Sequence, residues 1–111
     1  MMREPSAIDL LNARLDEVAD DVLSKQVGLL RDLIGCQTIS SPEPTETFTC
    51  EAARALDLVE PELCALGFTT ERWTTADGFP TLSSRCGSRQ PAPVIGFNGH
   101  LDVVPIEDPG K

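Results

Sequence analysis

The only histidine of the chain, His100, stands two residues before an aspartate, Asp102. In an extended segment, side chains alternate between two faces, so His100 and Asp102 point the same way and Leu101 points the other. A carboxylate beside an imidazole accepts the N–H of one ring nitrogen and leaves the other nitrogen for a metal ion. His100 is therefore a candidate metal ligand, although a histidine at a strand end is also compatible with a purely structural role.

The segment that carries this pair is apolar without a regular alternation. Between residues 94 and 104 its apolar residues are Val94, Ile95, Phe97, Leu101, Val103 and Val104. Such a run is typical of a strand buried on both faces in the middle of an α/β sheet. The sequence therefore predicts a central strand over 94–104. His100 then lies toward the C-terminal end of this strand, which is the edge where open α/β sheets bind their ligands.

A long helix is predicted near the start of the chain. Apolar residues recur at helical spacing from Ile8 to Ile34. Ser6 is the predicted N-cap, Asp9 stands in the capping-box position, and Gly35 is a natural stop. We expect this helix to pack on a sheet, and a partial heptad spacing leaves a short coiled coil as the alternative.

A second helix and a hairpin are predicted before the apolar strand. The helix runs from about Glu46 to Leu66 and ends at Gly67, and Pro61 is expected to kink or restart it. Two strand candidates, 68–75 and 81–86, flank the turn pair Asp77-Gly78, and a turn-rich loop covers 87–93. The fold class is therefore α/β. Two helices and a hairpin are thin cover for a central strand, so we expect the chain to be the front end of a longer protein.

Composition narrows the functional class. The net charge is −9 and the nine lysines and arginines form no basic stripe, which argues against nucleic acid as a partner. No apolar run is long enough to span a bilayer, and the N-terminus does not resemble an export signal. The expected location is the cytoplasm. The chain has four cysteines and no Cys-x-x-Cys pair: Cys36, Cys50, Cys64 and Cys86. In the cytoplasm we expect them to be reduced, largely buried thiols and not a redox or metal module.

The octapeptide Asn98–Pro105, preceded by Val94–Phe97, resembles the first metal-binding motif of the co-catalytic zinc aminoacylase and carboxypeptidase family. This family includes acetylornithine deacetylase, succinyl-diaminopimelate desuccinylase, aminoacylase and related dipeptidases. Two further stretches resemble its N-terminal region. They are the loop Gln37–Ser40 after the first helix, and the second helix with its Leu-Gly-Phe ending, Glu51–Phe68.

The resemblance implies a fold and a site. The fold would be the start of a three-layer zinc-peptidase-like catalytic domain, with residues 1–111 as its N-terminal portion and any dimerisation domain outside them. His100 would bind one of two zinc ions, for which cobalt could substitute, and Asp102 would be the catalytic residue that orients its ring. The resemblance also implies that the remaining ligands and a glutamate general base follow later in sequence, and no residue after Pro105 matches them. Glu107 and Asp108 are expected to be loop residues.

The implied activity is hydrolysis of an amide bond in a small N-acyl amino acid or peptide by a zinc-activated water. The parent protein could be a homodimer. Because a catalytic zinc normally takes three protein ligands, we expect this chain alone to bind zinc weakly and to hydrolyse nothing. The competing hypothesis is a non-catalytic small acidic α/β fragment, or an interaction module, in which His100 is structural and the exposed strand is an interface.

Overall fold

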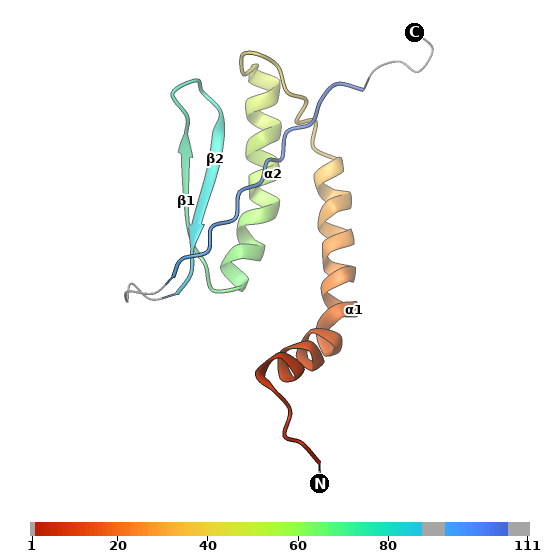
Figure 1. Ribbon diagram of the computed structural model, residues 1–111. Coiled ribbons are helices and arrows are strands. Elements are labelled where there is room, and N and C mark those ends of the chain that lie inside the picture. Colours follow the sequence, from red (N-terminus) through yellow and green to blue (C-terminus); the bar gives the residue numbers. More distant parts are fainter. Residues whose placement is uncertain (1, 88–92, 107–111) are drawn as a thin grey trace. The chain divides into compact units, whose positions relative to one another are not determined.

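The computed structural model describes residues 2–87 and 93–106. These residues fall into two compact units, one up to Arg31 and one from Asp32 onward. None of their helices is long and apolar enough to cross a membrane. The helices and strands, in chain order, are α1 (Ala7–Ile34), α2 (Glu46–Ala65), β1 (Thr69–Thr74) and β2 (Pro80–Arg85) (Figure 1).

The first helix, α1, begins and ends where the sequence predicts. The Ser6 hydroxyl accepts a hydrogen bond from the Asp9 backbone N–H at 3.2 Å, and the Asp9 carboxylate accepts one from the Ser6 N–H at 2.8 Å. This capping box satisfies donors that a helix N-terminus leaves without partners. None of the residues of α1 is buried. Its packing on a sheet and the alternative coiled coil therefore both stay predictions.

The second helix, α2, is capped at both ends. The Thr45 hydroxyl accepts from the Phe48 N–H at 3.0 Å. At the other end Gly67 has a φ of 89°, the Gly67 N–H donates to the Cys64 carbonyl, and the Phe68 N–H donates to the Leu63 carbonyl, both at 3.0 Å. These two bonds form a Schellman motif, which requires a left-handed residue and therefore favours glycine.

Pro61 lies inside α2, and the helix continues through it without a restart. The proline ring removes one N–H from the helical ladder, which normally costs stability. Two outcomes were expected at Pro61, a kink or a restart of the helix. The prediction of a restart is wrong.

Strands β1 and β2 form the predicted hairpin. They pair antiparallel, with Thr69 opposite Arg85 and Thr74 opposite Pro80. Gly78 has a φ of 93° in the connecting turn, and the Thr75 N–H donates to the Phe79 carbonyl at 2.9 Å. Both strands pack against α2, as Figure 1 shows.

The core of this second unit is small and lies mainly against α2. The rings of Phe48 and Phe79 meet edge to face, with centroids 5.7 Å apart and planes at 83°. This arrangement directs the positive edge of one ring toward the negative face of the other. The buried residues of the unit come from α2 and from the loop before it: Cys36, Thr38, Phe48, Ala55 and Leu56.

The central strand predicted over 94–104 is not formed. The described residues offer this segment a single bridge, in which Val103 pairs parallel with Ile39. Without strands on both sides its apolar side chains remain in solvent, and Val94 and Phe97 are 93% and 96% exposed. The prediction of a doubly buried strand is therefore wrong for this structure. The observed architecture is a small α/β arrangement of two helices and a two-stranded antiparallel sheet, and the three-layer fold stays a prediction.

The prediction for the cysteines is correct in one part only. All four thiols are free, but Cys36 alone is buried. Cys36 lies just beyond the end of α1, and its Sγ is 3.7 Å from the carbonyl oxygen of Asp32 in the last turn of that helix. Cys50, Cys64 and Cys86 are exposed, so the expectation of largely buried thiols is wrong.

Candidate functional site

The segment that carries His100 is held in place by the loop after α1. The Thr38 hydroxyl donates to the Leu101 carbonyl at 2.7 Å, and the Val103 N–H donates to the Thr38 carbonyl at 2.8 Å. The Ser40 N–H then donates to the Val103 carbonyl at 2.8 Å. Thr38 is only 3% exposed, so it is shielded from water, whereas its partners Leu101 and Val103 are 37% and 53% exposed.

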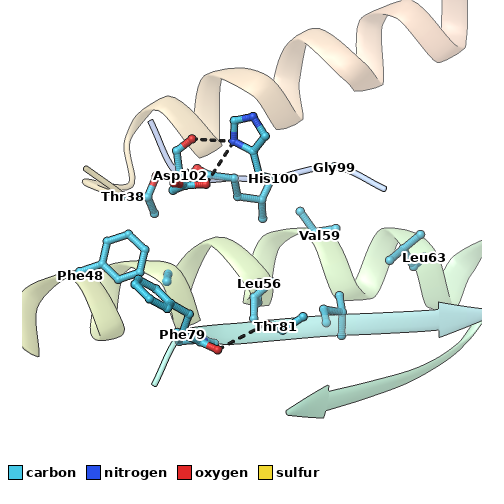
Figure 2. Close-up of a pocket in the computed structure, with 14 residues that line it drawn as sticks. Thr38, Phe48, Leu56, Val59, Leu63, Phe79, Thr81, Gly99, His100 and Asp102 are labelled. Carbon is cyan, nitrogen blue, oxygen red and sulfur yellow. Dashed lines mark hydrogen bonds and ion pairs between the residues drawn. The ribbon is translucent and has the colours of Figure 1, made fainter. Parts of the chain in front are cut away.

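His100 and Asp102 lie on the same side of this segment, as the spacing predicts. The His100 Nδ1 atom is 3.1 Å from the Asp102 carboxylate oxygen Oδ1 and 3.0 Å from the Asp102 backbone carbonyl oxygen. Figure 2 shows both contacts as dashed lines from the imidazole ring. Leu101, which lies between the two residues, is the least exposed of the large apolar residues in this segment.

The two contacts favour a ring that carries its proton on Nδ1. A carbonyl oxygen and a carboxylate oxygen can only accept hydrogen bonds, so the Nδ1 of His100 must be the donor. In the neutral imidazole the lone pair is then on Nε2. The side chain of His100 is 84% exposed and that of Asp102 is 44% exposed, so a ligand in solvent can reach the ring.

This arrangement fits one position in a metal site. A histidine that binds a metal through one nitrogen usually donates its other N–H to a carboxylate or a carbonyl, and the Nδ1 of His100 has both. The residues that the structure describes contain no group of three or more histidine, cysteine, aspartate or glutamate side chains able to hold a metal ion. They therefore fit a single ligand and its supporting acid, and Glu107 and Asp108 lie outside the described residues.

A pocket of about 620 Å³ lies beside this pair. Its floor is formed by side chains of α2 and β2, and the segment that carries His100 and Asp102 lies opposite. In Figure 2 the His100 ring and its contacts with Asp102 lie on the side of this segment that faces away from α2. Most of the lining is apolar, which suits an apolar group better than a free charge. The lining residues are Thr38, Phe48, Ala52, Leu56, Val59, Leu63, Phe79, Pro80, Thr81, Leu82, Gly99, His100, Leu101 and Asp102.

Two residues of this region were not singled out from the sequence. Thr38 was noted only as part of a loop, and its partner Leu101 is 63 residues away. Glu51 accepts a hydrogen bond from the Gln37 N–H at 2.7 Å, which ties the loop to α2. No local pattern identifies either contact, because each joins segments that only the folded chain brings together.

Comparison with known proteins gives one consistent group of relatives. The chain is 38% identical over 82 residues to the succinyl-diaminopimelate desuccinylase of Cereibacter sphaeroides. It is 37% identical over 84 residues to the enzyme of that name from Dinoroseobacter shibae, and 39% identical over 83 residues to succinyl-diaminopimelate desuccinylase 2 of a Ruegeria species. These stretches cover 74%, 76% and 75% of this chain.

The chain belongs to the same family as these desuccinylases. The resemblance predicted from the octapeptide around His100 is thereby confirmed. The matched residues span only 19%, 20% and 18% of the three desuccinylases. No family model matches the chain, and no solved structure matches it.

Proposed function

We propose that this chain supplies part of the active site of an amidohydrolase, and that its substrate is a small N-acylated amino acid or peptide. The relatives named as desuccinylases support the class of reaction, and they make succinyl-diaminopimelate the first substrate to test. The observation that carries the proposal is that the Nδ1 of His100 contacts both the carboxylate oxygen Oδ1 and the backbone carbonyl oxygen of Asp102. This contact leaves Nε2 available to a metal ion in a chain that is related to hydrolases.

In this proposal His100 holds a zinc ion through Nε2, and Asp102 orients the ring. When bound, zinc acidifies a water molecule and polarises the scissile carbonyl. The Asp102 carboxylate keeps the proton on Nδ1 and makes Nε2 a better ligand. The side chain of His100 is 84% exposed, so a metal ion and the substrate can reach Nε2 from solvent.

A catalytic zinc takes three protein ligands, and the described residues supply one. We therefore propose that the other ligands and the general base lie outside the described residues. On this proposal the isolated 111-residue chain binds zinc weakly and has no hydrolase activity.

The first experiment follows the imidazole resonances of the isolated chain while zinc is added. His100 is the only histidine, so its ring signals need no separate assignment. We expect the Nε2 signal to shift progressively without saturating at submicromolar zinc. Submicromolar binding with amidase activity would contradict the proposed division of the site, and an unshifted Nε2 signal would contradict the assignment of His100 as a ligand.

A second experiment uses the complete enzyme that contains this segment. His100→Ala should abolish release of succinate from succinyl-diaminopimelate while the circular dichroism of the enzyme stays unchanged. Retained turnover would show that His100 is not a ligand.

The exposed apolar residues of 94–106 favour a second candidate, an interaction module in which His100 is structural. Val94, Phe97 and Ile106 are each more than 90% exposed, which is typical of a surface that another polypeptide covers. This candidate predicts no specific shift of Nε2 with zinc and full turnover in His100→Ala. The same two experiments therefore separate the two functions.

A further inference from the structure

Thr38 holds the backbone on both sides of Asp102. Its hydroxyl donates to the Leu101 carbonyl, which belongs to the peptide group before Asp102. Its own carbonyl accepts from the Val103 N–H, which belongs to the peptide group after Asp102. The two peptide groups that flank one residue are thus both bonded to a single, buried threonine.

These bonds determine where the acceptors of His100 lie. The Nδ1 of His100 contacts the Asp102 backbone carbonyl at 3.0 Å and the Asp102 carboxylate at 3.1 Å. Both oxygens belong to Asp102. The flanking peptide groups define its two backbone dihedral angles, which place the carbonyl oxygen and the Cβ atom from which the carboxylate extends. The hydrogen bonds of Thr38 run to these peptide groups, and those of the imidazole run to Asp102.

Thr38 is itself anchored to α2 through its loop. The Gln37 N–H donates to the Glu51 carboxylate at 2.7 Å, and the Arg54 guanidinium lies 3.4 Å from the Gly35 carbonyl and 3.5 Å from the Glu51 carboxylate. A continuous set of contacts therefore leads from α2 through the loop to Asp102 and then to His100. Within this set the bond from the buried Thr38 hydroxyl is the one most shielded from solvent, and the contacts of Glu51, Arg54 and His100 are exposed.

We propose that Thr38 is a positioning residue that keeps the proton of His100 on Nδ1 and so presents Nε2 to solvent. The proposal deepens the proposed function and rests on it, because the presented Nε2 atom is the one assigned to the metal. The hydroxyl is the decisive group, since it supplies the 2.7 Å bond to the Leu101 carbonyl. A side chain of the same shape without a hydroxyl loses this bond, and a smaller side chain with a hydroxyl keeps it.

The ratio of the two neutral imidazole tautomers tests the proposal without any metal. Nitrogen-15 shifts of the ring report this ratio, and the single histidine makes the measurement unambiguous. We expect the Nδ1–H form to dominate in the native chain and in Thr38→Ser. In Thr38→Val we expect the ratio of Nδ1–H to Nε2–H to fall about fivefold. This corresponds to a loss, at the contacts of Nδ1 with Asp102, of about the free energy of one typical hydrogen bond.

Thr81→Val is the matched control. Thr81 also lines the pocket, but its hydroxyl contacts the Phe79 carbonyl and not the His100 segment. This variant should keep the native tautomer ratio. An unchanged ratio in Thr38→Val, or an equal fall in Thr38→Ser and Thr38→Val, would overturn the proposal.

A second variant keeps the test decisive if Thr38→Val unfolds the unit, which loss of the amide signals of β1 and β2 would reveal. Glu51→Ala removes the anchor of the loop from a partly exposed position, and we expect a smaller fall in the same ratio. Glu62→Ala, another exposed glutamate of α2, should leave the ratio unchanged. A native ratio in Glu51→Ala, when Thr38→Val is unfolded, would overturn the proposal.

Adding zinc to the same samples separates this inference from the proposed function. A tautomer ratio that depends on Thr38, together with a ring that does not respond to zinc, would support the positioning role and refute the metal role. A ring that responds to zinc equally in the native chain and in folded Thr38→Val would refute the positioning role and support the metal role.

Discussion

At the scale of single residues, Asp102 supplies the imidazole with two different acceptors. One is its backbone carbonyl and the other is its carboxylate, and they lie at 3.0 and 3.1 Å from the same Nδ1 atom. Only the carboxylate carries a charge. Loss of that charge should leave the ring in place and change how strongly Nε2 binds a cation.

Asp102→Asn tests this distinction. The amide oxygen can still accept from Nδ1, but the side chain no longer raises the basicity of the ring, so zinc affinity should fall by about 10- to 100-fold. A zinc titration that follows the His100 ring measures the change. Asp16→Asn removes the same charge from an exposed position of α1 and should have no effect. Equal zinc affinity in Asp102→Asn and the native chain would contradict the proposed role of Asp102.

Among the helices, two glycines have opposite effects on stability: Gly67 stabilises the end of α2, and Gly28 destabilises the interior of α1. Gly67 has a φ of 89° at the end of α2, where its N–H and that of Phe68 complete the Schellman motif. Gly28 lies inside α1, where a glycine costs helix stability. A Cβ atom added at either position would meet nothing within 4 Å, so backbone conformation alone decides both outcomes.

Gly67→Ala should therefore destabilise the unit that contains α2 by about 1–2 kcal/mol, because a left-handed conformation disfavours an L-residue with a Cβ atom. Gly28→Ala should stabilise α1 by about 0.5–1 kcal/mol. Denaturant titrations followed by circular dichroism at a helical wavelength measure both changes. A change of the same sign in the two variants would contradict this account of the helix ends.

Across the molecule, the unit from Asp32 onward has few buried residues among those that the structure describes. A cluster of ion pairs between β1 and α2 adds to its packing. Arg72 of β1 contacts Asp57 at 2.7 Å and Glu60 at 2.6 Å, both on α2. The Thr70 hydroxyl donates to the other Glu60 oxygen at 2.8 Å. The hydrogen bond from Thr70, followed by that from Arg72, lowers the pKa of Glu60 from its ordinary value of 4.5.

The direction of this shift predicts how stability depends on pH. A carboxyl group whose pKa is lower in the folded state stabilises that state above its unfolded pKa, and the contribution is lost as the pH falls through the folded pKa. We expect the free energy of unfolding to decrease below about pH 4.5. Glu60→Gln should reduce this decrease, as measured by urea titrations at several pH values. Equal acid sensitivity in Glu60→Gln and the native chain would contradict the role of Glu60.

Much of the fold could be predicted from the sequence because it depends on local signals. Ser6 with Asp9, Gly67 after an apolar helix, and Gly78 in a turn each act within a few residues, and the structure confirms all three. The segment 94–104 could not be predicted in this way. Its apolar composition is typical of a buried strand, but burial requires neighbouring strands, and the described residues provide one bridge to Ile39.

The pairing of His100 with Asp102 could be predicted from the sequence, because alternation along an extended backbone places residues two apart on one side. The family could also be predicted, through a continuous stretch of residues. The support that Thr38 and Glu51 give to this pair becomes visible only in the folded chain. Their contacts cross 63 and 14 residues of sequence, and no local rule relates positions so far apart until packing brings them into hydrogen-bonding distance.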